Sequence, residues 1–302
     1  MNKKTKMVMG ALFSVAGIFL LVSSAFAELT KVADNVYTYA DVKNASPLNS
    51  FGANAGIVIG NDGVLVVDTL ISAKEARRFL ADIRKITDKP IKYVVNTHYH
   101  LDHAFGNSEF TKLGATIIAS DIDGRNLAQY GEEFLKGAEN FGLTAQDMEG
   151  TSIALPVITF SDRMTIHLGG ETAELIYVMP SHTSGSILVY LPRQKILFSG
   201  DILFTDFHPY MIEGDVKGWI ENLKFIDKMD VAVIIPGHGP LSTKKDAQEI
   251  GDYLRTFDMI ALKMAAKGAS AEVIAAELTK KLPPRSQNEW VIIPNIKAKY
   301  VK

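Results

Sequence analysis

Three histidines and an aspartate fall within six consecutive positions of this sequence. They are His98, His100, Asp102 and His103, in the segment NTHYHLDHAFGN (residues 96–107), and the whole chain has only seven histidines. Imidazole and carboxylate ligands without sulfur suit zinc, with manganese and iron as alternatives. The chain contains no cysteine, so a metal bound here would be held by nitrogen and oxygen atoms alone.

The spacing of these residues favours two metal ions over one. His98 and His100 lie two positions apart, so on an extended turn their side chains point the same way and can share an ion. Asp102 and His103 lie on the next bend and point elsewhere, where they can hold a second ion. Four ligands from one short segment would surround a single tetrahedral ion only with severe strain.

Further polar residues follow short apolar runs that are typical of buried strands. Asp68 comes after VLVV, His98 after IKYVV, His182 after ELIYVMPS, Asp201 after KILFSG and His238 after VAVIIPG. If these strands are aligned, their ends gather the polar side chains at one edge of the sheets. Loops on a rigid scaffold are the usual place for a functional site.

The elements that must position these residues are visible in the hydrophobic pattern. β-Hairpins are predicted around Asn61-Asp62-Gly63 and around Arg193-Gln194, because each short polar turn separates two apolar runs. Other strands are predicted at 91–95, 116–120, 164–170, 174–180 and 231–239, and helices at 73–86 (capped by Ser72), 121–140 and 215–229. The repeated order of strands and helices predicts an α/β protein with two β-sheets packed face to face and helices outside.

The chain divides into three parts. Residues 1–27 read as a cleaved signal peptide, with three lysines, an apolar run over 7–22 and the cleavage site Ala25-Phe26-Ala27. Residues 28–240 are predicted to form the catalytic domain. Residues 241–302 are predicted to be a helical C-terminal extension packed on it, with helices at 244–267 and 270–281.

The signal peptide predicts an exported protein, periplasmic or secreted, without a stable membrane anchor. The alternative is a retained anchor, but the apolar run is short for a spanning helix. Loss of the three lysines would leave 29 basic and 34 acidic residues, a formal net charge of −5. With no basic stripe or patch, the expected partner is a small-molecule substrate and not nucleic acid. The sequence carries no indication of an oligomeric state.

Five motifs together resemble those of the metallo-β-lactamase fold superfamily. They are VVDT (66–69), THYHLDH (97–103), PSHTSGS (180–186), SGDILF (199–204) and PGHG (236–239), in the family's order over about residues 31–240. The HxHxDH pattern is highly specific for this superfamily. Each of the other four motifs is weak evidence alone, but the four together are strong evidence.

This resemblance implies an αββα sandwich of two mixed β-sheets flanked by helices, with a dinuclear metal site. It implies two ligand sets and one bridging residue: His98, His100 and His182 on the first ion, Asp102, His103 and His238 on the second, and Asp201 between them. Asp68 is similar to the family's aspartate that orients the ligand loop without binding metal.

The resemblance also implies a reaction. Two Zn²⁺ ions, with iron or manganese as alternatives, would activate a hydroxide that cleaves an ester, thioester, lactone or amide bond. Asp201 and Asp102 are the expected catalytic residues, the second by orienting the nucleophile or moving a proton. Loops 43–55, 130–152 and 204–216 are expected to wall the pocket. His208 and Tyr210 are candidate pocket residues, although packing inside the loop is the favoured interpretation for both.

Some features favour one branch of the family over another. Dedicated β-lactamases commonly have Cys or Ser where Asp201 stands, and many with Cys carry a Lys three residues later, where this chain has Phe204. Asp201 is similar to the glyoxalase II and general hydrolase branches, although residues 241–302 do not resemble the glutathione-binding domain of glyoxalase II. Residues 200–223, together with the export signal, resemble exported SoxH-like hydrolases.

Three other functions remain open on the sequence. Mononuclear iron dioxygenases that act on persulfides share the ligand motifs. A weak or true β-lactamase would use the same nucleophile. A non-catalytic metal-binding protein is disfavoured by the complete ligand set.

Overall fold

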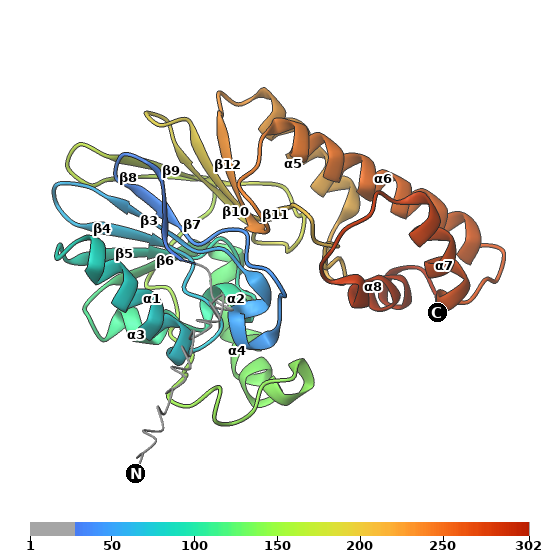
Figure 1. Cartoon of the computed structure of the whole chain (residues 1–302), viewed down its shortest axis with the longest axis horizontal. Helices are drawn as coiled ribbons and strands as arrows, with labels where there is room; N and C mark the ends of the chain where they lie inside the picture. The colour runs from blue at the N-terminus through green and yellow to red at the C-terminus, as the bar shows by residue number, and fades with distance from the viewer. Residues whose placement is uncertain (1–27, 302) are drawn as a thin grey trace, which may run out of the picture.

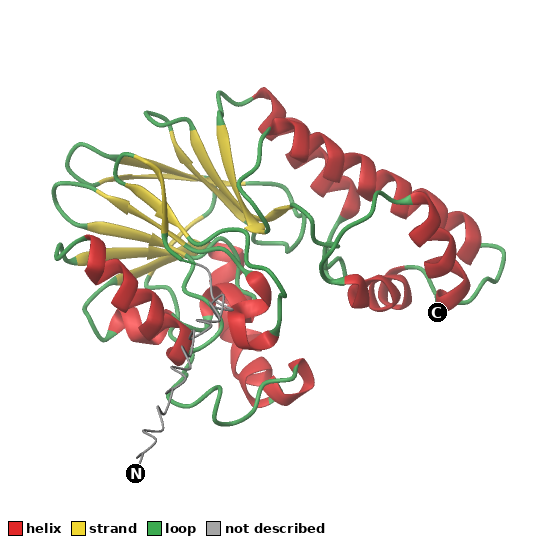
Figure 2. Ribbon diagram, viewed as in Figure 1, coloured by secondary structure: helices red, strands yellow, loops and turns green. Residues whose placement is uncertain are grey.

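The computed structural model describes residues 28–301, so the predicted signal peptide lies outside the described residues. Two β-sheets lie face to face, and helices cover their outer sides (Figure 1 and Figure 2). The mixed α/β sandwich expected from the sequence is confirmed. Across residues 28–301, no helix combines the length and the apolar character needed to span a membrane.

The first sheet is built from the N-terminal half of the chain and is mixed. Neighbouring strands are antiparallel from β1 to β4 and parallel from β4 to β7. In order across the sheet the strands are β1 (Thr30–Ala33), β2 (Val36–Thr38), β3 (Gly56–Ile59), β4 (Val64–Val67), β5 (Ile91–Val95), β6 (Thr116–Ser120) and β7 (Ile158–Phe160).

The second sheet follows in the C-terminal half. Its strands are antiparallel except for β11 and β12, which are parallel. In order across the sheet the strands are β12 (Val233–His238), β11 (Ile196–Phe204), β10 (Ile187–Leu191), β9 (Thr172–Tyr177) and β8 (Arg163–His167).

The helices fall into an N-terminal and a C-terminal group (Figure 1). The N-terminal group comprises η1 (Pro47–Gly52), α1 (Ala73–Ile86), α2 (Leu101–Ala104), α3 (Asn107–Thr111), α4 (Asp121–Lys136) and η2 (Ala138–Phe141). The C-terminal group comprises α5 (Val216–Lys228), α6 (Lys244–Ala265), α7 (Ala271–Lys281), η3 (Glu289–Val291) and α8 (Ile292–Lys299).

Alternation along the strands sorts apolar side chains into separate layers. On β4, Leu65 packs in the cluster between the sheets, whereas Val64 packs in the cluster that includes α1. On β10, Val189 lies between the sheets and Leu188 packs with the α5 and α6 side chains. Because successive side chains on a strand point to opposite faces, strands that are apolar on both faces need cover on both sides. Burial of this surface stabilises the layers by roughly 25 cal/mol per Å².

Helix α1 shows how local sequence sets one outer layer. The Ser72 Oγ caps the helix by accepting a hydrogen bond from the Glu75 amide at 3.3 Å. Ala76, Phe79 and Ile83 then recur on one helical face and are fully buried against the first sheet. The bounds of this helix match the prediction because its cap and its apolar face are both local signals.

Several local features of the structure differ from what the sequence predicts. Strand β11 continues through Asp201 to Phe204 instead of ending at the aspartate. The helix predicted over 121–140 ends at Lys136, where Gly137 follows, and a separate 3₁₀ turn continues the chain. The C-terminal residues, left unassigned by the pattern, form η3 and α8.

Candidate metal centre

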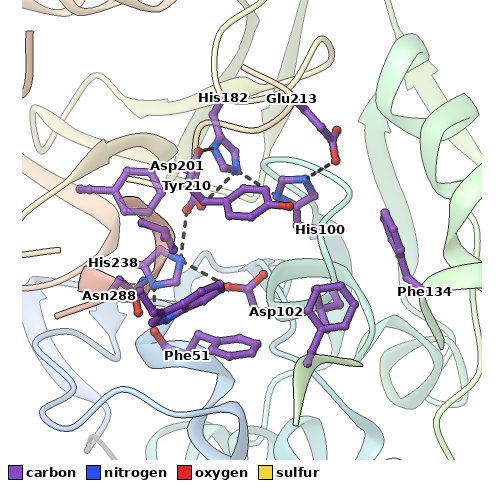
Figure 3. Close-up of a pocket in the computed structure, with 15 residues that line it drawn as sticks. Phe51, His100, Asp102, Phe134, His182, Asp201, Tyr210, Glu213, His238 and Asn288 are labelled. Atoms are coloured by element: carbon purple, nitrogen blue, oxygen red, sulfur yellow. Dashed lines mark hydrogen bonds and ion pairs between the residues drawn. The ribbon is translucent and has the colours of Figure 1, made fainter. Parts of the chain in front are cut away.

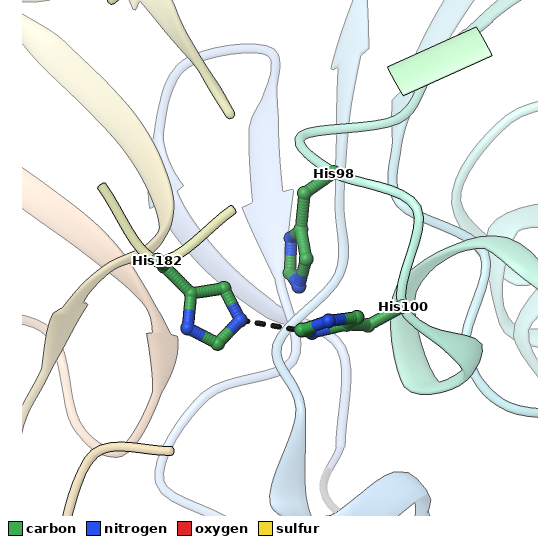
Figure 4. A group of neighbouring side chains, drawn as sticks. All are labelled: His98, His100 and His182. Atoms are coloured by element: carbon green, nitrogen blue, oxygen red, sulfur yellow. Dashed lines mark hydrogen bonds between the residues drawn. The ribbon is translucent and has the colours of Figure 1, made fainter. Parts of the chain in front are cut away.

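All seven predicted ligands converge where the two sheets meet their loops. His98, His100 and His182 have ligand atoms within 4.8 Å of one another (Figure 4). The same holds for Asp102, His103 and His238, and for the mixed group of His98, His103 and Asp201. We call these seven side chains the metal floor: His98, His100, Asp102, His103, His182, Asp201 and His238.

Asp201 lies between the two groups and turns one oxygen toward each. Its Oδ2 is 3.2 Å from His182 Nε2 and 3.8 Å from His98 Nε2. Its Oδ1 is 3.2 Å from His103 Nε2 and 3.5 Å from His238 Nε2. A carboxylate placed in this way can serve two ions at once.

Asp102 belongs to one group only. Its Oδ2 is 3.3 Å from His238 Nε2 and 3.6 Å from His103 Nε2. The two sides of the floor therefore differ in charge: one has three imidazoles, the other has two imidazoles and a carboxylate of its own.

Each histidine of the floor uses one ring nitrogen for a bond away from the centre. The partners are Thr97 Oγ1 for His98 Nδ1 (3.1 Å), Glu213 Oε1 for His100 Nε2 (3.4 Å), Asp68 Oδ2 for His103 Nδ1 (2.9 Å), the Tyr210 carbonyl for His182 Nδ1 (3.0 Å) and the Phe51 carbonyl for His238 Nδ1 (3.1 Å). Carbonyl and carboxylate oxygens only accept, and the Thr97 hydroxyl already donates its proton to Asp68, so these ring nitrogens carry the proton. The other nitrogen of each ring is left as a metal-binding acceptor.

The acceptor nitrogens fit bound cations. His182 Nε2 and His100 Nδ1 are 2.9 Å apart although both are acceptors, an arrangement that a cation between them would stabilise. His98 Nε2, His103 Nε2 and Asp201 Oδ1 are buried without a hydrogen-bond partner. Buried polar atoms are rarely left unpaired, so this donor set fits divalent metal ions held by nitrogen and oxygen.

The group of His98, His100 and His182 favours neutral imidazole rings. Burial holds the pKa of His98 well below its ordinary value, and the neighbouring His103 lowers it further. Burial also lowers the pKa of His182 to about 4. Neutral rings at neutral pH are the form in which histidine binds a metal.

The group of Asp102, His103 and His238, together with Asp201, concentrates negative charge. Burial opposes the charged form of His238, but the carboxylates of Asp201 and Asp102 outweigh it and raise the pKa to about 9. At Asp201 burial is likewise outweighed, by the surrounding histidines led by His238, and the carboxyl pKa lies well below its ordinary value. Asp201 therefore stays ionised, and a cation can replace the protons that these histidines would otherwise take up.

Asp68 anchors the ligand loop from below. Its carboxylate accepts from the Thr97 amide and hydroxyl, both at 2.7 Å, and from His103 Nδ1. The residue follows β4 with a left-handed φ of 61°, a conformation that aspartate tolerates better than most side chains. The turn thereby points the carboxylate at the loop that carries the ligands.

Two glycines allow the close approach of β11 and β12 at the floor. A Cβ on Gly237 would lie 1.9 Å from Asp201 Oδ1, and one on Gly200 would lie 2.6 Å from the Thr97 Cβ. Gly200 also has a φ of 50° where the register of the two strands shifts. Asp201 therefore projects from an irregular point inside β11 and not from the strand end predicted by the sequence, and His238 is the last residue of β12.

A pocket of about 640 Å³, counted with its open mouth, lies above the floor (Figure 3). Six aromatic side chains line it, and we call them the aromatic wall: Phe51, Phe134, Phe141, Phe204, Tyr210 and Trp290. The first five lie in or at the edge of the three loops predicted to form the pocket. Trp290 comes from the C-terminal extension, which the sequence did not implicate.

The two candidate pocket residues have different outcomes. Tyr210 lines the pocket, with its ring centroid 5.8 Å from that of His100. His208 does not line it; its Nδ1 is 2.8 Å from the Tyr253 hydroxyl in the buried contact with α6. His208 therefore packs in the core, as the favoured interpretation had it, because the chain turns between the two positions and directs this imidazole away from the pocket.

Sequence reasoning missed Glu213. Its carboxylate accepts from the Tyr99 hydroxyl at 2.5 Å and contacts His100, and it lines the pocket beside the floor (Figure 3). Burial raises its pKa, but the bonds from His100 and Tyr99 outweigh this and lower it to about 2. Its position in the predicted pocket loop 204–216 was the only signal.

Comparisons with known proteins agree with this geometry. A family model described as the metallo-beta-lactamase superfamily matches residues 48–238. The chain is 28% identical over 262 residues to a linear primary-alkylsulfatase from Pseudomonas sp., covering 74% of this chain and 49% of that protein. This chain therefore spans about half the length of that relative.

Two further comparisons cover more of the matching protein. The chain is 26% identical over 204 residues to an acyl-coenzyme A thioesterase from Homo sapiens, covering 62% of this chain and 72% of that one. A solved metallo-beta-lactamase from Pontibacter korlensis superposes with a TM-score of 0.62 at 22% identity, covering 76% of this chain and 99% of that one. The superposition supports the fold alone.

Proposed function

Since the chain belongs to the metallo-beta-lactamase superfamily, we propose that it is an exported dinuclear zinc hydrolase acting on a small molecule. The carrying observation is Asp201, whose two oxygens face two separate groups of ligand atoms. His98, His100 and His182 would hold one ion, Asp102, His103 and His238 the other, and Asp201 both. Export is inferred from the apolar segment and cleavage site of residues 1–27.

Bound metal ions would supply Lewis acidity and a lowered pKa for the attacking water. The protein's own groups prepare the site for that chemistry. Asp102 accepts a proton from, or orients, a nucleophile above the floor. Burial raises the pKa of Tyr210 to about 12, so its phenol stays protonated and can donate a hydrogen bond to a substrate oxygen.

The aromatic wall has a second role in this chemistry. Apolar side chains around the reacting bond exclude water and strengthen the electrostatic interactions made by the floor. Metal ions held by the floor would both activate the attacking water and polarise the bond to be cleaved. A nucleophilic Ser or Cys is therefore not required.

The cleaved bond is proposed to be an ester, thioester, lactone or amide. The related proteins are named as a sulfatase and a thioesterase, so the same scaffold serves more than one kind of bond. Phe204, which stacks on the His238 ring at 5.1 Å, stands where many β-lactamases of the family carry a lysine. Dedicated β-lactam hydrolysis is accordingly not proposed.

Metal content and hydrolysis measured together test this function. The mature protein and Asp201→Ala would be analysed by inductively coupled plasma mass spectrometry and assayed on ester, thioester, lactone, alkyl sulfate and β-lactam substrates. We expect about two zinc ions per wild-type chain and the loss of both metal and hydrolysis in the variant. One iron per chain without hydrolysis would contradict the proposal and favour oxygen-dependent sulfur chemistry.

A further inference from the structure

We propose that the part of the substrate lying away from the scissile bond is an uncharged aryl or alkyl group, recognised by the aromatic wall. This inference rests on the proposed function, because it concerns the substrate of the same site. It goes further by naming which substrates the pocket admits and which it rejects.

The chemistry of the lining supports an apolar ligand group. Phe134 lies 6.1 Å from the Tyr99 ring in a stacked arrangement and 6.3 Å from Phe141 edge to face. Phe51 and Tyr210 also line the pocket, with the Tyr210 ring beside that of His100 (Figure 3). Rigid aromatic surfaces of this kind bind flat or extended apolar groups with little loss of side-chain entropy.

The charge of the lining disfavours an anionic group. Among residues 28–301, none that lines the pocket is a lysine or an arginine, whereas Asp102, Asp201 and Glu213 all do. Metal ions would offset the two aspartates, which belong to the floor. Glu213 lies outside the ligand groups, and its carboxylate lines the pocket where it accepts a hydrogen bond from the Tyr99 hydroxyl at 2.5 Å.

Two basic side chains lie behind the residues that line the pocket, but they donate hydrogen bonds to backbone carbonyls there. Arg285 donates to the carbonyl oxygens of Phe204 and Phe207, both at 3.3 Å, and its side chain is only 3% exposed. Lys299 donates to the carbonyl of Gly214. A carboxylate or phosphate seated against the wall would therefore lose its hydration without gaining a cationic partner, which is costly.

The C-terminal extension places Trp290 at the mouth of the pocket. Asn295 is 1% exposed, and it accepts from the Met211 amide at 2.7 Å and donates to the Pro209 carbonyl at 2.9 Å. The His208 amide also donates to the Gln287 carbonyl at 3.0 Å. These bonds fasten η3 and α8 to the loop of Tyr210, while Trp290 itself stays 56% exposed. An exposed indole held by a rigid support is suited to close over an apolar ligand.

A matched pair of esters tests the inference. 4-Nitrophenyl pentanoate and mono-4-nitrophenyl glutarate have acyl chains of equal length and differ by a terminal carboxylate. We expect the zinc-loaded enzyme to show at least about tenfold higher kcat/KM for the neutral ester. Equal or higher kcat/KM for the glutarate would overturn the inference.

Two substitutions at one position separate charge from shape. Trp290→Leu keeps an apolar side chain, so we expect weaker turnover of both esters with their ratio retained. Trp290→Arg supplies the missing cation, so we expect the ratio to fall to about threefold or less. An unchanged ratio in Trp290→Arg would count against the charge argument.

Ligand binding gives a readout that does not depend on hydrolysis. N-Phenylpentanamide and its terminal carboxylic acid analogue, glutaranilic acid, would be titrated while tryptophan fluorescence is followed. The chain has two tryptophans, and Trp219 is fully buried, so Trp290→Leu is the control for the signal. Selective binding of the neutral anilide without any ester hydrolysis would refute the proposed function and keep this inference. Equal binding of both anilides would refute the inference even if hydrolysis is observed.

Discussion

The metal floor and the aromatic wall lie in contact but are built on different principles. The floor consists of polar side chains, and each of its histidines is held by a hydrogen bond to a partner behind it, such as Asp68 behind His103. The wall consists of aromatic side chains held by packing and drawn from segments as distant as η1 and η3. The difference indicates that the floor sets the reaction and the wall sets the substrate, so variants in each should fail in different ways.

The largest effect is expected from Asp68→Asn, which acts on the floor alone. The Asp68 carboxylate accepts three hydrogen bonds, from the amide and hydroxyl of Thr97 and from His103 Nδ1. In the asparagine variant the NH2 group would face one of these donors, and that hydrogen bond would be lost. We expect the affinity for zinc to fall about 10- to 100-fold, with hydrolysis of all substrates reduced alike. Competition with a chromophoric chelator would measure the affinity.

Asp34→Asn is a matched control, because this aspartate is exposed, pairs with Lys31 at 2.7 Å and lies outside the ligand groups. Its zinc affinity should equal that of the wild type. A normal zinc affinity in Asp68→Asn would show that the ligand loop holds its shape without this carboxylate, and the contrast between floor and wall would weaken.

An intermediate effect is expected from Glu213→Gln, because Glu213 touches both regions. It contacts His100 of the floor and faces the pocket. We expect kcat/KM for the neutral ester to fall about tenfold. The anionic ester should lose less, because the substitution also removes a negative charge.

Tyr99→Phe separates the two roles of Glu213, which are to hold His100 and to place a negative charge in the pocket. It removes the hydroxyl that donates to Oε2 but keeps the carboxylate charge. The ratio of the two esters should therefore stay at its wild-type value. Equal loss for both esters in Glu213→Gln would assign this residue to the floor alone.

The smallest effect is expected from Phe141→Ala, which acts on the wall alone. The substitution removes apolar contact surface in the pocket, so we expect KM for the neutral ester to rise about 3- to 10-fold. Zinc content and kcat should stay unchanged. Phe225→Ala, on the half-exposed surface of α5 and away from the pocket, is the control. Loss of zinc in Phe141→Ala would contradict the separation of the two regions.

Much of the scaffold could be predicted because its signals are local. The cap and apolar face of α1 and the polar turn between β3 and β4 each lie within a few residues of the element that they define. Strand β11 was misjudged because Asp201 looks like a strand end, whereas pairing with β12 carries the chain onward past a shift in register. Such pairing is a tertiary interaction and leaves no trace in the local pattern.

The candidate residues of the floor could be listed from the sequence alone. Four of them stand at HxHxDH spacing, which has few uses other than metal binding, and His182, Asp201 and His238 follow in the family's motif order. The tertiary structure was needed to establish that Asp201 turns one oxygen toward each ligand group, that Glu213 contacts His100, and that Trp290 reaches the pocket from the C-terminal extension. It also decided that His208 faces Tyr253 and not the pocket. These facts depend on side-chain direction and on contacts between distant segments. The local sequence around a Trp, Glu or Phe does not indicate which distant residues it will contact in the folded chain.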